Sequence, residues 1–260
     1  MLPLRVAIAQ RNMHWSIAEN VDSAIDAINL AGANEANVCI FPELSVTGFH
    51  RKIRTLCDFG QLESALADIG RACRKAAVAA FVGVPTLRDD RWFNSYVCIA
   101  ANGERIGCID KNSLTPAEAM LFAPGCQRPV MSLLRSRVSA VLCREIEDTE
   151  LITTQLADQS VGLIFWPGIM RPDPQSATCQ EPYIDCARRL AVHLNAYVVQ
   201  ANWPNSLNYP AEGAEQGRSI VIAPTGQTLL RLPKAESGIG IFSLGSSQFD
   251  WYPDYLASAG

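Results

Sequence analysis

The feature that most constrains the fold of this chain is the alternation of short apolar runs with segments of helical spacing and with tight turns. Isoleucine and valine recur every three to four positions over residues 17–28, which predicts an amphipathic helix. Asn102-Gly103 separates two strand-like runs and predicts a hairpin. Helical crossovers mixed with antiparallel hairpins indicate an α/β (α+β) protein, with two mixed β-sheets packed face to face and helices outside.

The expected elements follow one another along the whole chain. No low-complexity linker interrupts them, so we predict a single domain over residues 1–260. Ser16 and Glu19 form a capping box before the first helix, which residues 32–34 stop. The other expected helices are 62–76, 146–156 and 182–194, and the expected strands are 6–9, 38–41, 78–84, 94–100, 105–109, 138–142, 161–166, 197–201, 219–223, 228–232 and 239–244.

Composition narrows the possible partners of the protein. The 260 residues are 48% hydrophobic and carry a net charge of -4, which favours neither nucleic acid nor an anionic membrane as partner. The longest apolar runs are too short to span a bilayer, and the N-terminus lacks the pattern of a signal peptide. Nine cysteines without a CxxC pair favour a reduced cytoplasmic compartment over a disulfide scaffold or a zinc site.

Three reactive side chains lie just beyond the C-terminal ends of expected strands. They are Glu43, Lys111 and Cys143. Strand ends of this kind gather at one edge of a sheet, where sites form in α/β folds. The carboxylate can take the thiol proton, the lysine can stabilise an oxyanion, and the thiol can carry an acyl group. The expected helix after Cys143 also favours the thiolate, because backbone N–H groups at a helix start create a positive potential.

Each of these residues alone also has an ordinary interpretation. A cysteine in an apolar strand is usually an inert core residue, and a lysine leaving a strand is usually a surface charge. A Cys/His enzyme of the papain type would need a histidine base. The chain has only His14, His50 and His193, and none lies in a motif that pairs it with Cys143.

The ordered set of motifs resembles the nitrilase, or carbon–nitrogen hydrolase, superfamily from about residue 5 to residue 244. The resemblance rests on four groups of residues. These are Phe41-Pro42-Glu43-Leu44 with Thr47-Gly48-Phe49; Lys111 with Leu114, Glu118, Phe122, Pro124 and Gly125; the strand ending in Cys143, with Glu150; and Asn94-Ser95, Pro167, Asn202 and Pro224-Thr225-Gly226.

This resemblance implies a four-layer α-β-β-α sandwich and a Glu–Lys–Cys triad of Glu43, Lys111 and Cys143. It implies a second catalytic glutamate at Glu118 and an amidase-like hydrolysis of a small-molecule amide without metal or organic cofactor. It also implies a homodimer or larger homo-oligomer, which we expect to form across the helix after Cys143 and the helix at 182–194.

The sequence departs from the family pattern directly after the nucleophile, where it reads Arg144-Glu145-Ile146-Glu147. Residues in this region shape the acyl pocket, so the substrate stays open between an amide, an N-carbamoyl amino acid and a nitrile. We expect substrate contacts from Phe49, Arg144, Trp166 and Met170 and from the loop 203–216, with Arg144 either a carboxylate clamp or a surface charge. A non-catalytic binding protein on the same fold is the alternative of another class.

Overall fold

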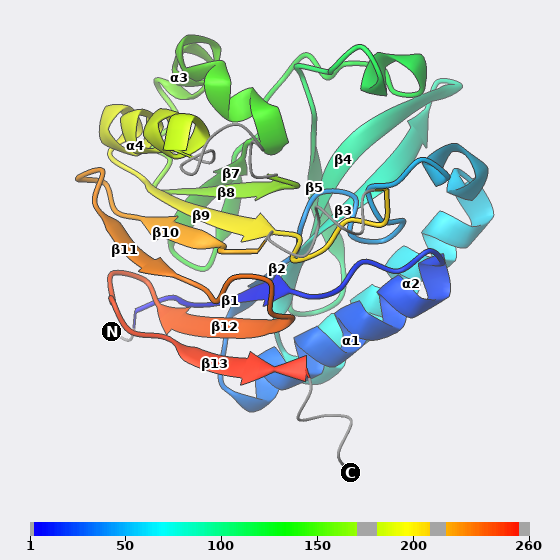
Figure 1. Ribbon diagram of the computed structural model, residues 1–260, viewed down its shortest axis with the longest axis horizontal. Coiled ribbons are helices and arrows are strands. Elements are labelled where there is room, and N and C mark those ends of the chain that lie inside the picture. The colour runs from blue at the N-terminus through cyan, green and yellow to red at the C-terminus, as the bar shows by residue number, and fades with distance from the viewer. Residues whose placement is uncertain (1–2, 171–180, 209–216, 255–260) are drawn as a thin grey trace.

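The computed structural model describes residues 3–170, 181–208 and 217–254, which form two mixed β-sheets between two pairs of helices (Figure 1). The seven-stranded sheet contains, in spatial order, β13 (Asp250–Pro253), β12 (Gly238–Ser243), β1 (Arg5–Gln10), β2 (Val38–Ile40), β3 (Ala79–Arg88), β4 (Arg91–Ile99) and β5 (Arg105–Asp110). The six-stranded sheet contains β11 (Thr228–Arg231), β10 (Ile220–Ile222), β9 (Tyr197–Asn202), β8 (Leu163–Gly168), β7 (Ser136–Ala140) and β6 (Met131–Leu133).

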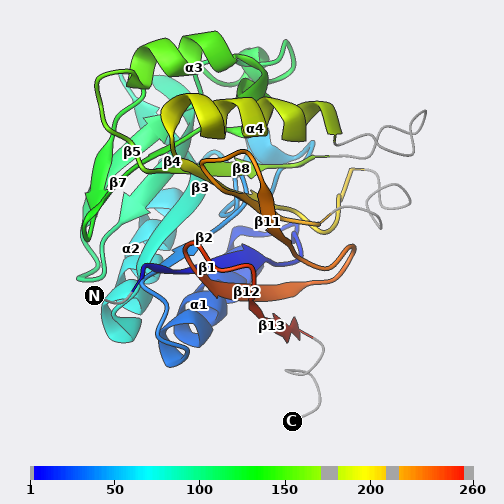
Figure 2. The same cartoon turned by 90° about the vertical axis from the view of Figure 1, so that its left-hand side faces the viewer.

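The helices cover the outer faces of the two sheets. Within the described ranges, the α-helices are α1 (Ile17–Ala33), α2 (Phe59–Ala76), α3 (Thr149–Leu156) and α4 (Glu181–Leu194). The short 3-10 helices there are η1 (Ile53–Leu56), η2 (Glu118–Met120) and η3 (Cys143–Glu147). Figure 2 shows α1 and α2 on one side of the stacked sheets and α3 and α4 on the other. In the described ranges, no helix is both long and apolar enough to cross a membrane.

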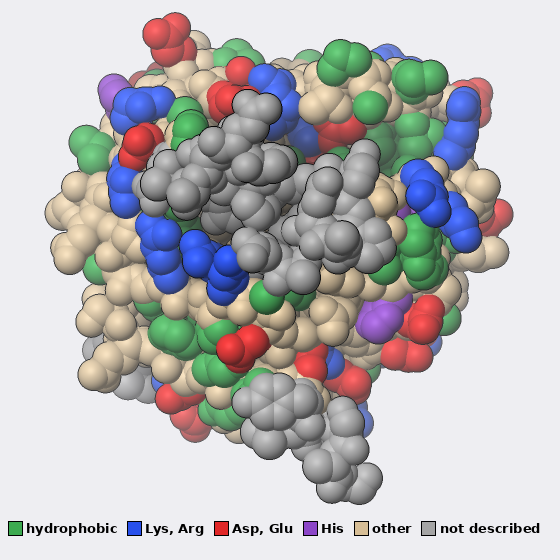
Figure 3. Space-filling view, in the orientation of Figure 1, with side chains coloured by type: hydrophobic (Ala, Val, Ile, Leu, Met, Phe, Trp, Pro, Cys, Tyr) green, Lys and Arg blue, Asp and Glu red, His purple; other side chains and the backbone are tan. Residues whose placement is uncertain are grey.

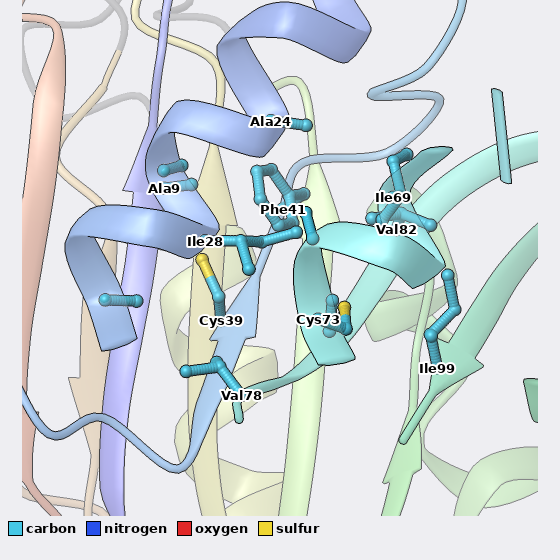
Figure 4. Close-up of a cluster of buried hydrophobic side chains, with 14 of the residues drawn as sticks. Ala9, Ala24, Ile28, Cys39, Phe41, Ile69, Cys73, Val78, Val82 and Ile99 are labelled. Atoms are coloured by element: carbon cyan, nitrogen blue, oxygen red, sulfur yellow. The ribbon is translucent and has the colours of Figure 1, made fainter. Parts of the chain in front are cut away.

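Three layers of buried apolar side chains lie between the four structural layers. One packs α1 and α2 onto the seven-stranded sheet, and Figure 4 shows Ile28 of α1 and Ile69 of α2 near Cys39 and Val82 of that sheet. A second fills the space between the two sheets, and a third lies between the six-stranded sheet and α3 and α4. Burial of apolar area on both faces of each sheet is the dominant stabilising contribution in such a sandwich.

This architecture confirms the predicted α-β-β-α sandwich. Parallel pairing of β1 with β2 and of β2 with β3 requires the crossovers that α1 and α2 supply, and β7, β8 and β9 repeat this arrangement. Ser16 caps α1 as expected, because its side chain accepts a hydrogen bond from the backbone N–H of Glu19.

Some elements differ from the sequence prediction. The strand expected to end at residue 84 continues to Arg88 and turns through Asp89 and Asp90, both at positive φ, directly into β4. Without a glycine, this two-residue turn gave no hairpin signal. The helix expected at 146–156 is divided into η3 and α3, and the short edge strands β6 and β13 were not predicted.

Gly83 of β3 is the point at which the seven-stranded sheet touches the turn that carries Glu43. A Cβ added there would lie 2.1 Å from the backbone nitrogen of Leu44 and 2.9 Å from the carbonyl carbon of Glu43. Only a residue without a side chain allows this contact between two stretches of backbone.

We therefore predict that Gly83→Ala lowers the free energy of unfolding by about 1–3 kcal/mol, because the turn must shift to relieve the overlap. Urea unfolding measures this change. Gly162→Ala is the matched control, since a Cβ there meets no atom within 4 Å. Equal unfolding free energies for the two variants would contradict the prediction.

Candidate active site

Glu43 lies in a turn that directly follows β2 and rests against β3. Its neighbour Leu44 has a φ of +54°, in the left-handed region, which bends the chain sharply after the carboxylate. The backbone N–H of Gly83 donates to Ser45 Oγ at 2.9 Å, and the Gly83 carbonyl accepts from the backbone N–H of Val46 at 2.9 Å. These bonds fix the turn on the sheet, so β3 determines where the carboxylate lies.

Lys111 follows β5 and is 1% exposed. Its ammonium donates to Glu43 Oε1 at 2.8 Å and to Glu118 Oε1 at 2.5 Å. The side-chain NH2 of Asn94 donates to the same Glu43 oxygen at 2.8 Å. The backbone carbonyl of Asn94 accepts from the backbone N–H of Lys111 at 2.8 Å. Among the described residues, Glu43 Oε2 has no hydrogen-bond partner, which leaves a buried acceptor for an incoming proton.

Glu118 begins η2, in the loop that leads away from Lys111. Its second carboxylate oxygen, Oε2, accepts from the backbone N–H of Thr115 at 2.8 Å. The Thr115 hydroxyl in turn accepts from the backbone N–H of Glu118 at 3.2 Å. The side chain is therefore held at both oxygens, by its own loop and by the lysine.

Opposite charges offset one another in part in this buried cluster of one ammonium and two carboxylates. Burial disfavours the charged form of Lys111, but the neighbouring Glu43, Cys143 and Glu118 outweigh it and raise the pKa of the ammonium. Burial raises the pKa of Glu43, Lys111 lowers it, and the charge of Glu118 raises it, with a net upward shift. The lysine therefore stays charged, and Glu43 is a stronger base than an exposed glutamate.

Cys143 follows β7 after two further apolar residues and begins η3 with a φ of +54°. The end of β8 closes over it: a Cβ on Gly168 would lie 3.3 Å from Cys143 Cα. Burial raises the pKa of the thiol to about 12; the charge of Glu43 adds to this, while Lys111 and a backbone hydrogen bond with Ile169 lower it. The expected preference for thiolate is therefore wrong, because desolvation and Glu43 outweigh the N–H groups of a short 3-10 helix.

Two buried tryptophans hold the backbone of the site. The indole N–H of Trp166 donates to the Cys143 carbonyl oxygen at 2.9 Å, and that of Trp203 donates to the Glu43 carbonyl oxygen at 3.0 Å. Trp166 is 0% exposed and packs in the core beneath α4. The expectation that Trp166 contacts substrate is therefore corrected: its side chain supports the Cys143 backbone from the core.

The other predicted substrate residues lie in different surroundings. Arg144 pairs with Glu147 at 3.5 Å and is about one-third exposed. Met170 is buried against α4, and its backbone N–H donates to the side chain of Asn202 at 2.8 Å. Residues 203–208 of the predicted loop are described, whereas 209–216 lie outside the described residues.

A cavity of about 420 Å³ opens beside Glu118, between the segments 44–54 and 115–122. Phe49 lines it, together with other apolar side chains of both segments. Arg51 and Arg54 also line the cavity, and both are exposed. On the face of the molecule drawn in Figure 3, Lys and Arg side chains lie beside hydrophobic ones at the right. This cavity was not anticipated, since it depends on how two loops distant in sequence approach each other.

Sequence reasoning also missed residues whose roles depend on long-range contacts. Asn94 formed part of the family resemblance, but its bond to Glu43 needed the pairing of β4 with β3, the strand on which the turn of Glu43 rests. Trp203 stands directly after Asn202 at the end of β9, which was the only signal for it.

The chain belongs to the carbon-nitrogen hydrolase family, whose model matches residues 5–249. One similar solved structure is an amidase from Nesterenkonia sp., with 22% identity, a TM-score of 0.81 and coverage of 94% of this chain and 90% of that chain. Another is a mutant of the Nesterenkonia sp. AN1 amidase in complex with butyramide, with 23% identity, a TM-score of 0.81 and coverage of 94% of this chain and 91% of that chain. At this level of identity the likeness shows the nitrilase fold.

One curated relative is the glutamine-dependent NAD(+) synthetase of Acinetobacter baylyi, which is 22% identical over 240 residues. The match covers 90% of this chain but only 42% of the relative. The chain therefore corresponds to less than half of that larger enzyme.

The charge balance at Lys111 generates a prediction about stability. Lys111→Met leaves Glu43 and Glu118 buried without their cation, and we expect a loss of about 3–5 kcal/mol in the free energy of unfolding. This loss should be larger at pH 8 than at pH 5. Without the ammonium, the pKa of the buried carboxyls lies further above its value in the unfolded chain. Such a carboxyl destabilises the folded state once it ionises, that is, as the pH rises through the folded pKa.

Urea unfolding at the two pH values measures the effect. Lys75→Met, which removes an exposed lysine from the last turn of α2, is the control and should change little. A Lys111→Met protein as stable as the control, or one whose deficit shrinks as the pH rises, would contradict the charge balance.

Proposed function

We propose that the protein is an amidase-like hydrolase of non-peptide C–N bonds. The observation that carries this proposal is the buried Lys111 ammonium, which bridges Glu43 and Glu118. All three charges lie close enough to Cys143 to shift the pKa of its thiol. Base, cation and nucleophile would then be available together in one site. A non-catalytic binding protein would gain nothing from burying this costly set of charges.

Acylation would begin when Cys143 attacks the amide carbonyl carbon while its proton moves to Glu43. Since the thiol pKa is about 12, little thiolate exists beforehand, and proton transfer must accompany attack. The negative charge that develops on the carbonyl oxygen would be stabilised by Lys111 and by the backbone N–H of Arg144. The C–N bond then breaks, Glu43 returns the proton to the nitrogen, and ammonia or an amine leaves.

Deacylation would use the same groups on the thioester. Glu43 takes a proton from water as the water oxygen attacks the acyl carbon. The C–S bond then breaks, and Glu43 returns the proton to the departing sulfur, so that the carboxylic acid leaves and the Cys143 thiol is restored. Glu118, held by Lys111 and Thr115, would orient the substrate or its leaving group. No step requires a metal ion or an organic cofactor.

The relatives support an amide as substrate. A structure of the Nesterenkonia sp. AN1 amidase carries the acetamide moiety of fluoroacetamide on its active-site cysteine, and another holds butyramide. The curated synthetase depends on glutamine, which is itself a primary amide. N-carbamoyl and nitrile hydrolysis are the alternatives that the same nucleophile permits.

We also propose that the protein forms a homodimer or larger homo-oligomer and acts in the cytoplasm. Leu151 of α3 and Val192 of α4 are exposed apolar side chains on the face where the sequence places the dimer interface. Buried on dimer formation, they would contribute apolar contact area.

The substrate's acyl group would occupy the cavity beside Glu118. Its walls are mainly apolar, so an alkyl chain fits, and Arg51 and Arg54 favour an acidic end. Arg144 is a weaker candidate for a carboxylate clamp, since its guanidinium already pairs with Glu147. This moves the expected determinants of specificity from the residues after Cys143 to the segments around η1 and η2.

The test of the function is product release combined with labelling of the nucleophile. Ammonia release is measured over a panel of amides, carbamoyl amino acids and nitriles, and peptide mass spectrometry locates the acylated residue. We expect turnover of amides and acylation at Cys143. Glu43→Gln should lower kcat by about 10²–10⁴-fold, because both half-reactions need the base. Activity retained in Cys143→Ala, or a folded Glu43→Gln protein with normal turnover, would refute the proposal.

Acyl selectivity is tested with a pair of amides of equal length, hexanamide and the monoamide of adipic acid. The double variant Arg51→Ala/Arg54→Ala should raise KM for the acidic amide about fivefold and leave hexanamide unchanged, since exposed charges contribute about 1 kcal/mol. Arg135→Ala, in the turn between β6 and β7, is the control. A selective effect in Arg144→Ala instead would assign the clamp to Arg144.

A further inference from the structure

Glu145 is a fully buried carboxylate two residues after Cys143 that takes no part in the reaction steps above. Its Oε2 accepts from the backbone N–H of Leu142 at 2.8 Å. Its Oε1 accepts from the backbone N–H of Asn112 at 2.5 Å and of Ser113 at 3.1 Å. One side chain therefore binds three backbone donors from two separate segments.

Those two segments carry two of the site's reactive groups. Leu142 directly precedes Cys143, and Asn112 directly follows Lys111. Lys111 extends from β5 of the seven-stranded sheet, whereas Cys143 extends from β7 of the six-stranded sheet. Glu145 thus forms a hydrogen-bonded link between the sheets at the point where ammonium and thiol must act on the same carbonyl group.

Arg128 compensates the charge of Glu145. Its guanidinium lies 3.2 Å from Oε1 and 3.4 Å from Oε2, and it also donates to the Ala140 carbonyl at 2.6 Å and to Gln155 at 3.1 Å. Arg128 does not touch the backbone next to Lys111 in any of these bonds. It therefore supports the buried charge, while Glu145 bonds directly to both segments.

We propose that Glu145 is a positioning residue that fixes Lys111 relative to Cys143 across the interface of the two sheets. This inference rests on the proposed function. Charge-assisted bonds to backbone N–H groups are short and directional, so they hold both strand ends to within a fraction of an ångström. A displacement of about 1 Å at such a site costs on the order of 10²-fold in rate.

The proposal separates two measurable steps. Hydrolysis of an amide needs Lys111 at the developing oxyanion, whereas alkylation of Cys143 by iodoacetamide displaces iodide and forms no oxyanion. In Glu145→Gln one acceptor oxygen becomes an NH2 group, which faces a donor and breaks the link on one side. We expect kcat for an amide to fall about 10–100-fold, with KM and the rate of Cys143 alkylation changed less than threefold.

Arg128→Gln is the matched variant, because it removes the other half of the same ion pair. It should lower the melting temperature at least as much as Glu145→Gln but reduce kcat less than threefold. If Glu145→Gln does not fold, Glu145→Asp replaces it: the shorter side chain keeps the charge but cannot reach both segments, and it should show the same selective loss of kcat.

Three results would overturn the positioning role: an unchanged kcat in the folded Glu145 variant, equal losses of kcat in the Glu145 and Arg128 variants, or a parallel fall of kcat and alkylation rate. The wild-type protein reports separately on the proposed function. If it alkylates at Cys143 but hydrolyses no amide of the panel, the proposed function fails, and the role inferred for Glu145 fails with it.

Discussion

A buried ammonium shared by two carboxylates is the interaction on which the site depends. Taking Lys111, Glu43 and Glu118 out of water costs several kcal/mol for each charge, and the attraction among them offsets this only when the geometry is tightly held. The four-layer sandwich supplies that rigidity. β2, β3, β4 and β5 lie side by side in one sheet, so the positions of Glu43, Asn94 and Lys111 follow from strand register.

Cys143 comes from the other sheet, and its position relative to Lys111 is a second requirement. Apolar packing between sheets is not directional and does not fix one strand end against another to a fraction of an ångström. Directional bonds beside the site do so: the Trp203 indole, next to β9, donates to the Glu43 carbonyl, and Glu145 accepts from the segment after Lys111. The Trp203 and Glu145 side chains are buried, so water competes little for these bonds.

The contrast between local strand order and long-range contacts between the sheets explains what the sequence could and could not predict. Strands, helices and the residues at strand ends follow from local patterns, and Glu43, Lys111 and Cys143 were proposed as site residues from them. The roles of Asn94, Trp203 and Glu145 depend on partners 33 to 160 residues away, which no local pattern specifies. The protonation state of Cys143 was predicted wrongly. The pKa of its thiol is raised by burial beneath the end of β8 and by the charge of Glu43, and neither is visible in the local sequence.

A raised pKa does not by itself distinguish Cys143 from the structural cysteines. Burial also raises the pKa of Cys73 and of Cys98 to about 12, yet both lie in apolar cores where no carboxylate is placed to take a proton. Cys143 differs in having Glu43 close enough to raise its pKa further and Lys111 close enough to oppose that shift. Glu43, whose charge raises the thiol pKa at rest, would accept the thiol proton, and Lys111, which opposes that shift, would hold the oxyanion once a carbonyl group arrives. In the proposed mechanism Cys143 is therefore mostly protonated at rest, and it becomes a strong nucleophile as its proton moves to Glu43.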